Sequence, residues 1–310
     1  MGRILSAMRL AIAILVSAAL VLAACTSDDS SGIETPSTTA APLTTLAPPG
    51  GTSSTTTTVP APDESTTTTV PPPSNECVVG TDTSVEGFTV SCTVLGLTIR
   101  AAEDVDGDAV TAQAERVYQM LIFRPDLTAA IVEAGLEGRV IPDGVRITNV
   151  PGFEELYELY PGIDWNRRGR SFPGNVELPL FAGAEENLLC LEEPYYFGED
   201  EFVRAFALTI RRFGLDVVDE PTSEAIEVSY ARAIAAGLWK NTLAEINSDE
   251  YWVEGVQSYF DANLEDNAED REPNSSHNAV NTRDELRDYD PALWTVAQSV
   301  FGETEWRPAC

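Results

Sequence analysis

A long stretch of this 310-residue chain lacks the side chains from which a protein core is built. From Thr26 to Ser74 the residues are mostly Ser, Thr, Pro, Ala and Gly, with threonine runs at 55–58 and 66–69. Such a segment cannot bury enough apolar surface to offset the entropy lost on ordering. We therefore expect residues 25–75 to form a disordered tether and residues 76–310 to form a single globular domain.

The start of the chain has the features of an export signal. Two arginines precede an apolar run, residues 10–24, that is too short to span a bilayer but suits the core of a signal peptide. The run ends in Leu22-Ala23-Ala24-Cys25, which resembles the lipobox of bacterial lipoproteins. This resemblance implies that residues 1–24 are a lipoprotein signal peptide and that Cys25 carries a lipid anchor. An ordinary signal peptide with a chance cysteine is the alternative.

The net charge of the chain indicates which classes of partner it can bind. Fifty acidic residues oppose 19 basic ones, giving a formal net charge of −31. A polyanion is repelled by nucleic-acid phosphates and by anionic lipid headgroups. We expect that the chain has no nucleic-acid partner and that the lipid on Cys25 attaches it to the cell membrane. We expect the domain to be extracytoplasmic and monomeric, with a peptide, a cell-wall component or a protein as its ligand.

Five cysteines occur, at positions 25, 77, 92, 190 and 310. With Cys25 set aside for lipid, an even number remains in an exported chain, which predicts two disulfides. Three pairings are open. We favour Cys77 with Cys92, which would close a hairpin across a turn-rich stretch, and Cys190 with Cys310. A thiolate metal site is less favoured, because no two cysteines have close ligand spacing.

Hydrophobic periodicity predicts an α+β fold. Alternating apolar and polar residues predict a β-hairpin over 76–100, and helical spacing predicts helices over 108–123 and 125–135. Short strands are expected over 140–150 and loops over 151–198. Helices are expected over 199–213, 222–236, 248–263 and 291–301, and Gly214 is expected to end the first of them. A small hairpin and mixed sheet would therefore precede a mainly helical half.

Four stretches together are similar to secreted bacterial zincin-type metallopeptidase domains, the gluzincins that resemble anthrax lethal factor. The similarity covers nearly all of residues 77–307 and implies a zincin-like fold. The stretches are Glu-Glu-Asn-Leu-Leu-Cys at 185–190, the helix at 202–210, the aromatic helix at 250–260, and His-Asn-Ala-Val-Asn-Thr-Arg at 277–283.

In that family the first helix carries His-Glu-Phe-Ala-His, in which two histidines bind zinc and the glutamate is the general base. The matching residues here are Arg204-Ala205-Phe206-Ala207-Leu208. The resemblance places Arg204 and Leu208 at the two histidine positions and Ala205 at the base. It places Glu250 at the third ligand, with Glu254 one helical turn further on as its partner.

Arginine cannot bind zinc, because its guanidinium stays protonated and offers no lone pair. The resemblance therefore implies a degenerate site with no metal and no cofactor. We expect an inactive peptidase homologue, not an enzyme, that acts in binding or in envelope structure. Because an unpaired buried carboxylate is costly, we also predict an ion pair between Arg204 and Glu250, with Leu208 in the space of the lost imidazole.

Two questions stay open at the level of sequence. His277 is the only histidine, and it is either a loop or capping residue or a ligand-contacting residue at the edge of a cleft. The alternative function is a glycosidase-like hydrolase that uses paired carboxylates in the same cleft. Its candidate residues are Glu185, Glu186, Glu250 and Glu254.

Overall fold

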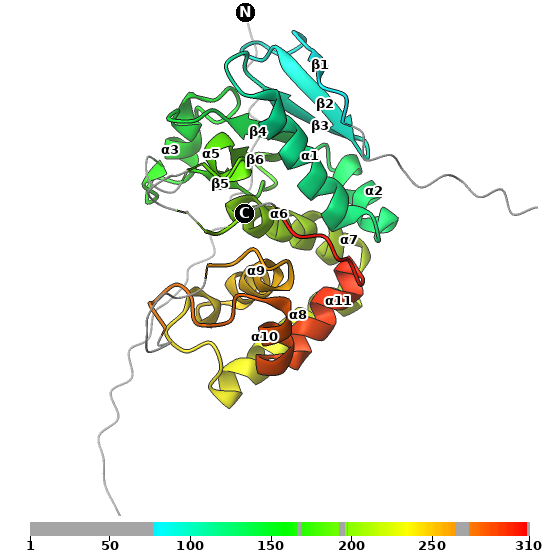
Figure 1. Cartoon of the computed structure of the whole chain (residues 1–310), viewed down its shortest axis with the longest axis vertical. Helices are drawn as coiled ribbons and strands as arrows, with labels where there is room; N and C mark the ends of the chain where they lie inside the picture. The colour runs from blue at the N-terminus through cyan, green and yellow to red at the C-terminus, as the bar shows by residue number, and fades with distance from the viewer. Residues whose placement is uncertain (1–76, 166–168, 192–195, 197, 265–272, 309–310) are drawn as a thin grey trace, which may run out of the picture. The chain divides into compact units, whose positions relative to one another are not determined.

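The computed structural model describes residues 77–165, 169–191, 196, 198–264 and 273–308 (Figure 1). The signal peptide, Cys25 and the tether predicted for residues 1–75 lie outside the described residues, as does Cys310. Within the described part of the chain, no helix combines the length and the apolar character needed to cross a bilayer.

A six-stranded mixed sheet forms the first half of the domain. Its spatial order is β1-β2-β3-β4-β6-β5. The strands β1 to β3 pair antiparallel, β3, β4 and β6 pair parallel, and β5 pairs antiparallel with β6 at the far edge. Their bounds are β1 Gly80–Thr81, β2 Val90–Val94, β3 Leu97–Ala101, β4 Glu137–Ile141, β5 Ser171–Phe172 and β6 Leu180–Ala184.

The predicted hairpin and its disulfide are both present. Leu95 and Gly96 form the turn between β2 and β3 with φ angles of 50° and 86°, the left-handed backbone of a two-residue hairpin turn. Cys77 bonds to Cys92, which confirms that pairing. Cys190 is also disulfide-bonded, to a partner outside the described residues. Its pairing with Cys310 stays a prediction.

Two helices follow the hairpin where the periodicity predicted them. Helix α1, Gly107–Leu121, begins at Asp106, whose carboxylate accepts a hydrogen bond from the Asp108 amide. It lies against the sheet (Figure 1). Helix α2, Pro125–Glu133, has proline in its first turn and is followed by Gly135 at φ 73°.

The second half of the domain is helical, as expected. Helix α6 continues through a π-helical turn, Arg211–Leu215, into the short helix α7. Short helices α3 and α5 and two 3₁₀ turns, Ile147–Asn149 and Leu243–Glu245, lie in the connections. The helix bounds are α3 Leu156–Leu159, α5 Glu185–Leu188, α6 Glu201–Ile210, α7 Asp216–Val218, α8 Glu220–Ala236, α9 Ser248–Tyr259, α10 Arg283–Tyr289 and α11 Pro291–Phe301.

Three local predictions are wrong. The strand expected over 140–150 spans only Glu137–Ile141, because Pro142 follows it without an amide hydrogen for the ladder. The loop region 151–198 contains β6, whose residues are all buried and so show no alternation. Gly214 lies inside the π-helical turn and does not end the helix. A Cβ there would lie 3.2 Å from Leu127, so close packing explains this glycine.

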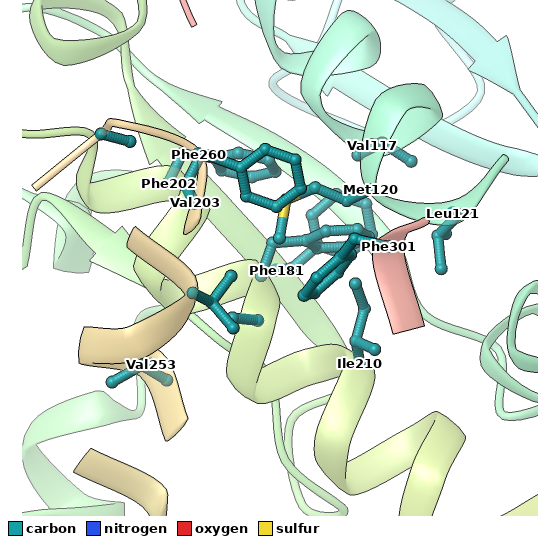
Figure 2. Packing of buried hydrophobic residues seen from close by; sticks show 14 of the residues in the cluster. Val117, Met120, Leu121, Phe181, Phe202, Val203, Ile210, Val253, Phe260 and Phe301 are labelled. Carbon is teal, nitrogen blue, oxygen red and sulfur yellow. The ribbon is translucent and has the colours of Figure 1, made fainter. Parts of the chain in front are cut away.

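The main hydrophobic core joins the two halves. Side chains from α1, β6, α6, α9 and α11 meet in it (Figure 2). Phe202 stacks on Phe206 along one side of α6. The ring centroid of Phe206 lies 5.1 Å from that of Phe181 on β6. With this aromatic side of α6 against the sheet, the helix carries Arg204 toward α9.

Candidate functional site

The start of α6 is held in place by a buried ion pair. Asp200 caps the helix by accepting a hydrogen bond of 2.9 Å from the Val203 amide. Its other carboxylate oxygen lies 2.6 Å from Nε of Arg116 on α1, and both side chains are buried. This double attachment fixes the positions of Glu199 and Glu201 on either side of the cap.

Arg204 links α6 to three residues of α9. Its guanidinium donates to Glu250, to Glu254 at 3.2 Å and to the Gln257 side-chain oxygen at 3.2 Å. The predicted ion pair between Arg204 and Glu250 is therefore confirmed. Glu250 and Glu254 are one turn apart on the same helix, so one arginine reaches both.

Glu254 is the most buried acid of the site. It has no exposed surface, and it accepts hydrogen bonds from Arg204, from Asn263 at 3.0 Å and from His277. Burial alone would raise the pKa of the Glu254 carboxyl. The hydrogen bond and charge of His277, together with Arg204, outweigh burial and lower that pKa.

His277 lies inside the site rather than in an exposed loop. Its Nδ1 is 2.8 Å from Glu254, its Nε2 is 3.5 Å from Glu199, and only 6% of the residue is exposed. Burial lowers the pKa of His277, but the hydrogen bond and charge of Glu254 raise it by more. His277 belongs to the loop before α10, as one reading expected, and its side chain also lines the pocket, so its contact with a ligand stays a prediction.

The Glu199 carboxyl has a strongly raised pKa. Burial, and then the neighbouring charge of Glu201, raise its pKa to about 8, against the smaller opposing effects of His277 and Arg204. Burial also raises the pKa of Glu201. At neutral pH the Glu199 carboxyl is therefore largely protonated and can donate a hydrogen bond.

These side chains face a pocket of about 870 Å³. Its lining includes the polar residues Glu199, Glu201, Arg204, Glu250 and His277, and Ile163, Tyr196, Leu243 and Leu264 supply apolar surface. A concave site with apolar walls and a few converging polar groups is the usual form of a ligand-binding site.

The remaining candidate residues lie elsewhere. Ala205 is buried, and Leu208 is half-buried and packs against the main core, so its proposed replacement of an imidazole stays a prediction. Glu185 accepts hydrogen bonds from the backbone amides of Asp106 and Asp143. Glu186 forms a two-point ion pair with Arg170. Both glutamates therefore have structural partners, and neither belongs to the lining of the pocket.

The residues at this position do not fit a zinc ion. The guanidinium of Arg204 contacts both acids of α9, and neither Ala205 nor Leu208 offers a lone pair. Among the residues that the structure describes, no group of three or more histidine, cysteine or acidic side chains is arranged to hold a metal.

Sequence reasoning missed four residues of the site: Glu199, Glu201, Gln257 and Asn263. Gln257 and Asn263 hold Arg204 and Glu254, and polar side chains in an aromatic helix region gave no distinctive signal. The three consecutive acids Glu199-Asp200-Glu201 at the start of the helix predicted over 199–213 were a usable signal, since only one of them is needed as the cap.

Comparisons with known proteins give one structural relative. No protein-family model matches this chain, and no curated protein does. A solved structure, that of the Pro-Pro endopeptidase PPEP-2 from Paenibacillus alvei, matches 65% of this chain and 96% of its own length. The sequence identity is 12% and the TM-score is 0.42. The expected α+β fold is confirmed by the six-stranded mixed sheet and the helices of the described residues.

That match corrects one prediction. We expected from the sequence that this chain is an inactive homologue and not an enzyme. The matched protein is an endopeptidase, which contradicts that expectation. The missing His-Glu-x-x-His residues on α6 remove the donors of one metal motif. They do not establish that the chain lacks activity, and we withdraw the assignment.

Proposed function

We propose that this chain is a membrane-tethered, extracytoplasmic domain whose pocket around Arg204 binds a peptide or a cell-wall component. The observation that supports this most directly is the pocket of about 870 Å³, whose lining contains both charged and apolar side chains. Ligand-binding sites in proteins have volumes of about 300–1,000 Å³ and mix apolar walls with a few polar groups in this way.

The polar part of the pocket is organised in advance of any ligand. Arg204 is held by three residues of α9, and Glu254 is held by Arg204, Asn263 and His277. A ligand that enters finds these side chains already ordered, so less conformational entropy is lost on binding. Such order on both helices favours a binding role over a purely structural one.

Binding is tested with fluorescent peptides and with soluble cell-wall fragments. A bulky side chain at the pocket, Ser276→Trp, is expected to weaken binding by at least about tenfold, because it occupies ligand space. The matched control is Val176→Trp at a position that is 86% exposed and away from the pocket. Equal binding by the two variants would contradict a role for this pocket.

The tether and anchor are tested in cells. Replacing Cys25 by serine removes the acceptor of the predicted lipid. We expect the wild-type chain in the membrane fraction and the Cys25→Ser chain in the soluble extracytoplasmic fraction. If Cys25→Ser stays in the membrane fraction, the lipid anchor is not what holds this protein there.

A second candidate function is hydrolysis by carboxylic acids, and Glu199 is the observation that favours it. A carboxyl with a pKa of about 8 is protonated at neutral pH and can act as a general acid. Glu250, which is about one-third exposed, is the partner acid at the same pocket. Turnover of peptide and glycan substrates that falls by about 100-fold in Glu199→Gln would support this function.

A further inference from the structure

The positively charged groups of the pocket are already engaged by acids of the same site. Arg204 donates to Glu250, Glu254 and Gln257, and His277 has one ring nitrogen at Glu254 and the other near Glu199. An anionic ligand would have to displace one of these buried interactions, which is costly. The site is therefore poorly suited to a carboxylate or phosphate.

Glu199 and Glu201, by contrast, have acceptor capacity to spare. The side chain of Glu199 is 6% exposed and lines the pocket. Its Oε2 makes only long contacts, 3.4 Å to Gln257 and 3.5 Å to His277, and its Oε1 accepts no hydrogen bond from the residues that the structure describes. Glu201 accepts one side-chain hydrogen bond, 3.1 Å from the Ser171 hydroxyl. Both residues line the pocket, so these carboxyl oxygens are available to a ligand.

The balance of charge points the same way. Two acids, Glu250 and Glu254, face two cations, Arg204 and His277, in direct ion pairs. Glu199 and Glu201 remain as additional acids, on either side of Asp200 at the start of α6. Two carboxyl groups at the wall of a pocket attract a positively charged donor and repel each other when both are ionised.

We infer that Glu199 and Glu201 form a subsite for the primary ammonium group of the ligand. An ammonium carries three donors on a compact charge, which matches two carboxyl groups with open acceptor sites. This inference rests on the proposed ligand-binding function and names its ligand class: peptides or wall fragments that carry a free amine. The amine belongs either to a lysine-type side chain or to a free N-terminus, and both present the same chemistry.

Binding of an ammonium has a second consequence, the release of protons. Burial and Glu201 raise the pKa of Glu199 to about 8, so this carboxyl holds a proton at neutral pH. A cation placed beside it stabilises the ionised form and lowers that pKa. The heat of binding then depends on the ionisation enthalpy of the buffer, because the buffer takes up the released proton.

The test is calorimetric titration of the exported chain with Cys25→Ser at neutral pH in phosphate and in Tris. The probes are the blocked tripeptide acetyl-Ala-Lys-Ala-amide, the same peptide with Nε-acetyl-lysine, and Ala-Ala-Ala-amide with a free N-terminus. We expect the lysine peptide or the free N-terminus to bind at least about tenfold more tightly than the acetyl-lysine peptide, with proton release. The better of the two amine probes identifies the source of the ammonium.

Two variants with the same change of charge separate the subsite from the general acidity of the chain. Glu199→Gln should bring the preference for the amine below about threefold and abolish proton release. Glu103→Gln, an exposed position that does not line the pocket, should leave both unchanged. An equal loss of preference in both variants would overturn the subsite, because it would reflect net charge alone.

Failure of the inference is distinguishable from failure of the proposed function. If the acetyl-lysine peptide binds as tightly as both amine probes, the pocket binds peptides and the ammonium subsite is overturned. If none of the three peptides binds, and cell-wall fragments also fail to bind, the proposed function is overturned together with the subsite.

Discussion

The guanidinium of Arg204 on α6 donates hydrogen bonds to two acids and one side-chain amide of α9, namely Glu250, Glu254 and Gln257. One of these acids, Glu254, has no exposed surface. A charge in such a place requires partners, because its transfer from water is costly. The contacts of Arg204 therefore serve stability as well as the shape of the pocket, and the two effects can be separated by substitution.

Replacing Arg204 by leucine should lower the free energy of unfolding by about 3 kcal/mol, because a buried carboxylate loses a charged partner. Chemical denaturation at neutral pH measures this change. The control is Arg287→Leu, which removes an exposed ion pair with Asp284 and should change stability by less than about 0.5 kcal/mol. Equal effects of the two substitutions would mean that Glu254 does not depend on Arg204.

The titration of Glu199 should make the free energy of unfolding depend on pH. Its pKa rises from an ordinary value of 4.5 to about 8 on folding, so the folded chain binds more protons than the unfolded chain between these values. The stability contributed by this group is present at pH 4.5 and below, and it is lost as the pH rises toward 8. The raised pKa of His277 acts in the same direction above its ordinary value of 6.5.

Glu199→Gln supplies a neutral side chain of the same shape at every pH. Between pH 5 and pH 8 the variant should lose less stability than the wild type, by on the order of 2 kcal/mol. Denaturant unfolding at several pH values measures both curves, with Glu103→Gln as the control. Parallel curves for Glu199→Gln and the wild type would show that this carboxyl titrates normally in the folded chain.

Among the elements, α9 is the one on which the helical half depends. Its aromatic residues pack in the main core, and its acids bind Arg204 of α6. Gly255 lies at the contact with α11: a Cβ there would lie 2.6 Å from Cγ of Leu293, which is fully buried. The close approach of α9 and α11 therefore depends on a residue without a side chain.

Gly255→Ala tests this approach. Alanine favours a helix over glycine by about 1 kcal/mol, but crowding against Leu293 should outweigh that gain and give a net loss of about 1–3 kcal/mol. Gly107→Ala, in the first turn of α1 with open space around it, is the matched control and should not destabilise the protein. Thermal unfolding of both variants compares them. A stable Gly255→Ala variant would mean that α11 shifts without cost.

At the scale of the whole molecule, a disulfide ties the start of the described chain to the sheet. Cys77 and Cys92 are 15 residues apart, and Cys92 is buried in the main core. A covalent link of this length restricts the unfolded chain more than the folded one. It adds stability to a domain whose strong net negative charge opposes compaction.

Removal of this disulfide should destabilise the domain by about 3 kcal/mol, the value typical for a loop of this length. The double variant Cys77→Ser, Cys92→Ser compared with the wild type by denaturant unfolding measures the effect. Tyrosine fluorescence or circular dichroism should still report a folded domain, because the apolar side chains of α1, α6 and α9 still form the core without the linkage. A loss below about 0.5 kcal/mol would contradict a stabilising role.

Local periodicity in the sequence was sufficient to predict the hairpin, α1, α2 and α11, because each has one buried face and recognisable ends. It was insufficient for β6, which is buried on both faces, and for Gly214, whose role is contact with a distant helix. The pair Arg204–Glu250 followed from the resemblance to zincin-type domains, which places an arginine and an acid at two ligand positions of one metal motif. Only the tertiary structure placed Glu199 and His277 together at the wall of a pocket, with the buried Glu254 in contact with His277. Their pKa shifts arise from burial and from neighbours distant in the chain, which no local pattern encodes.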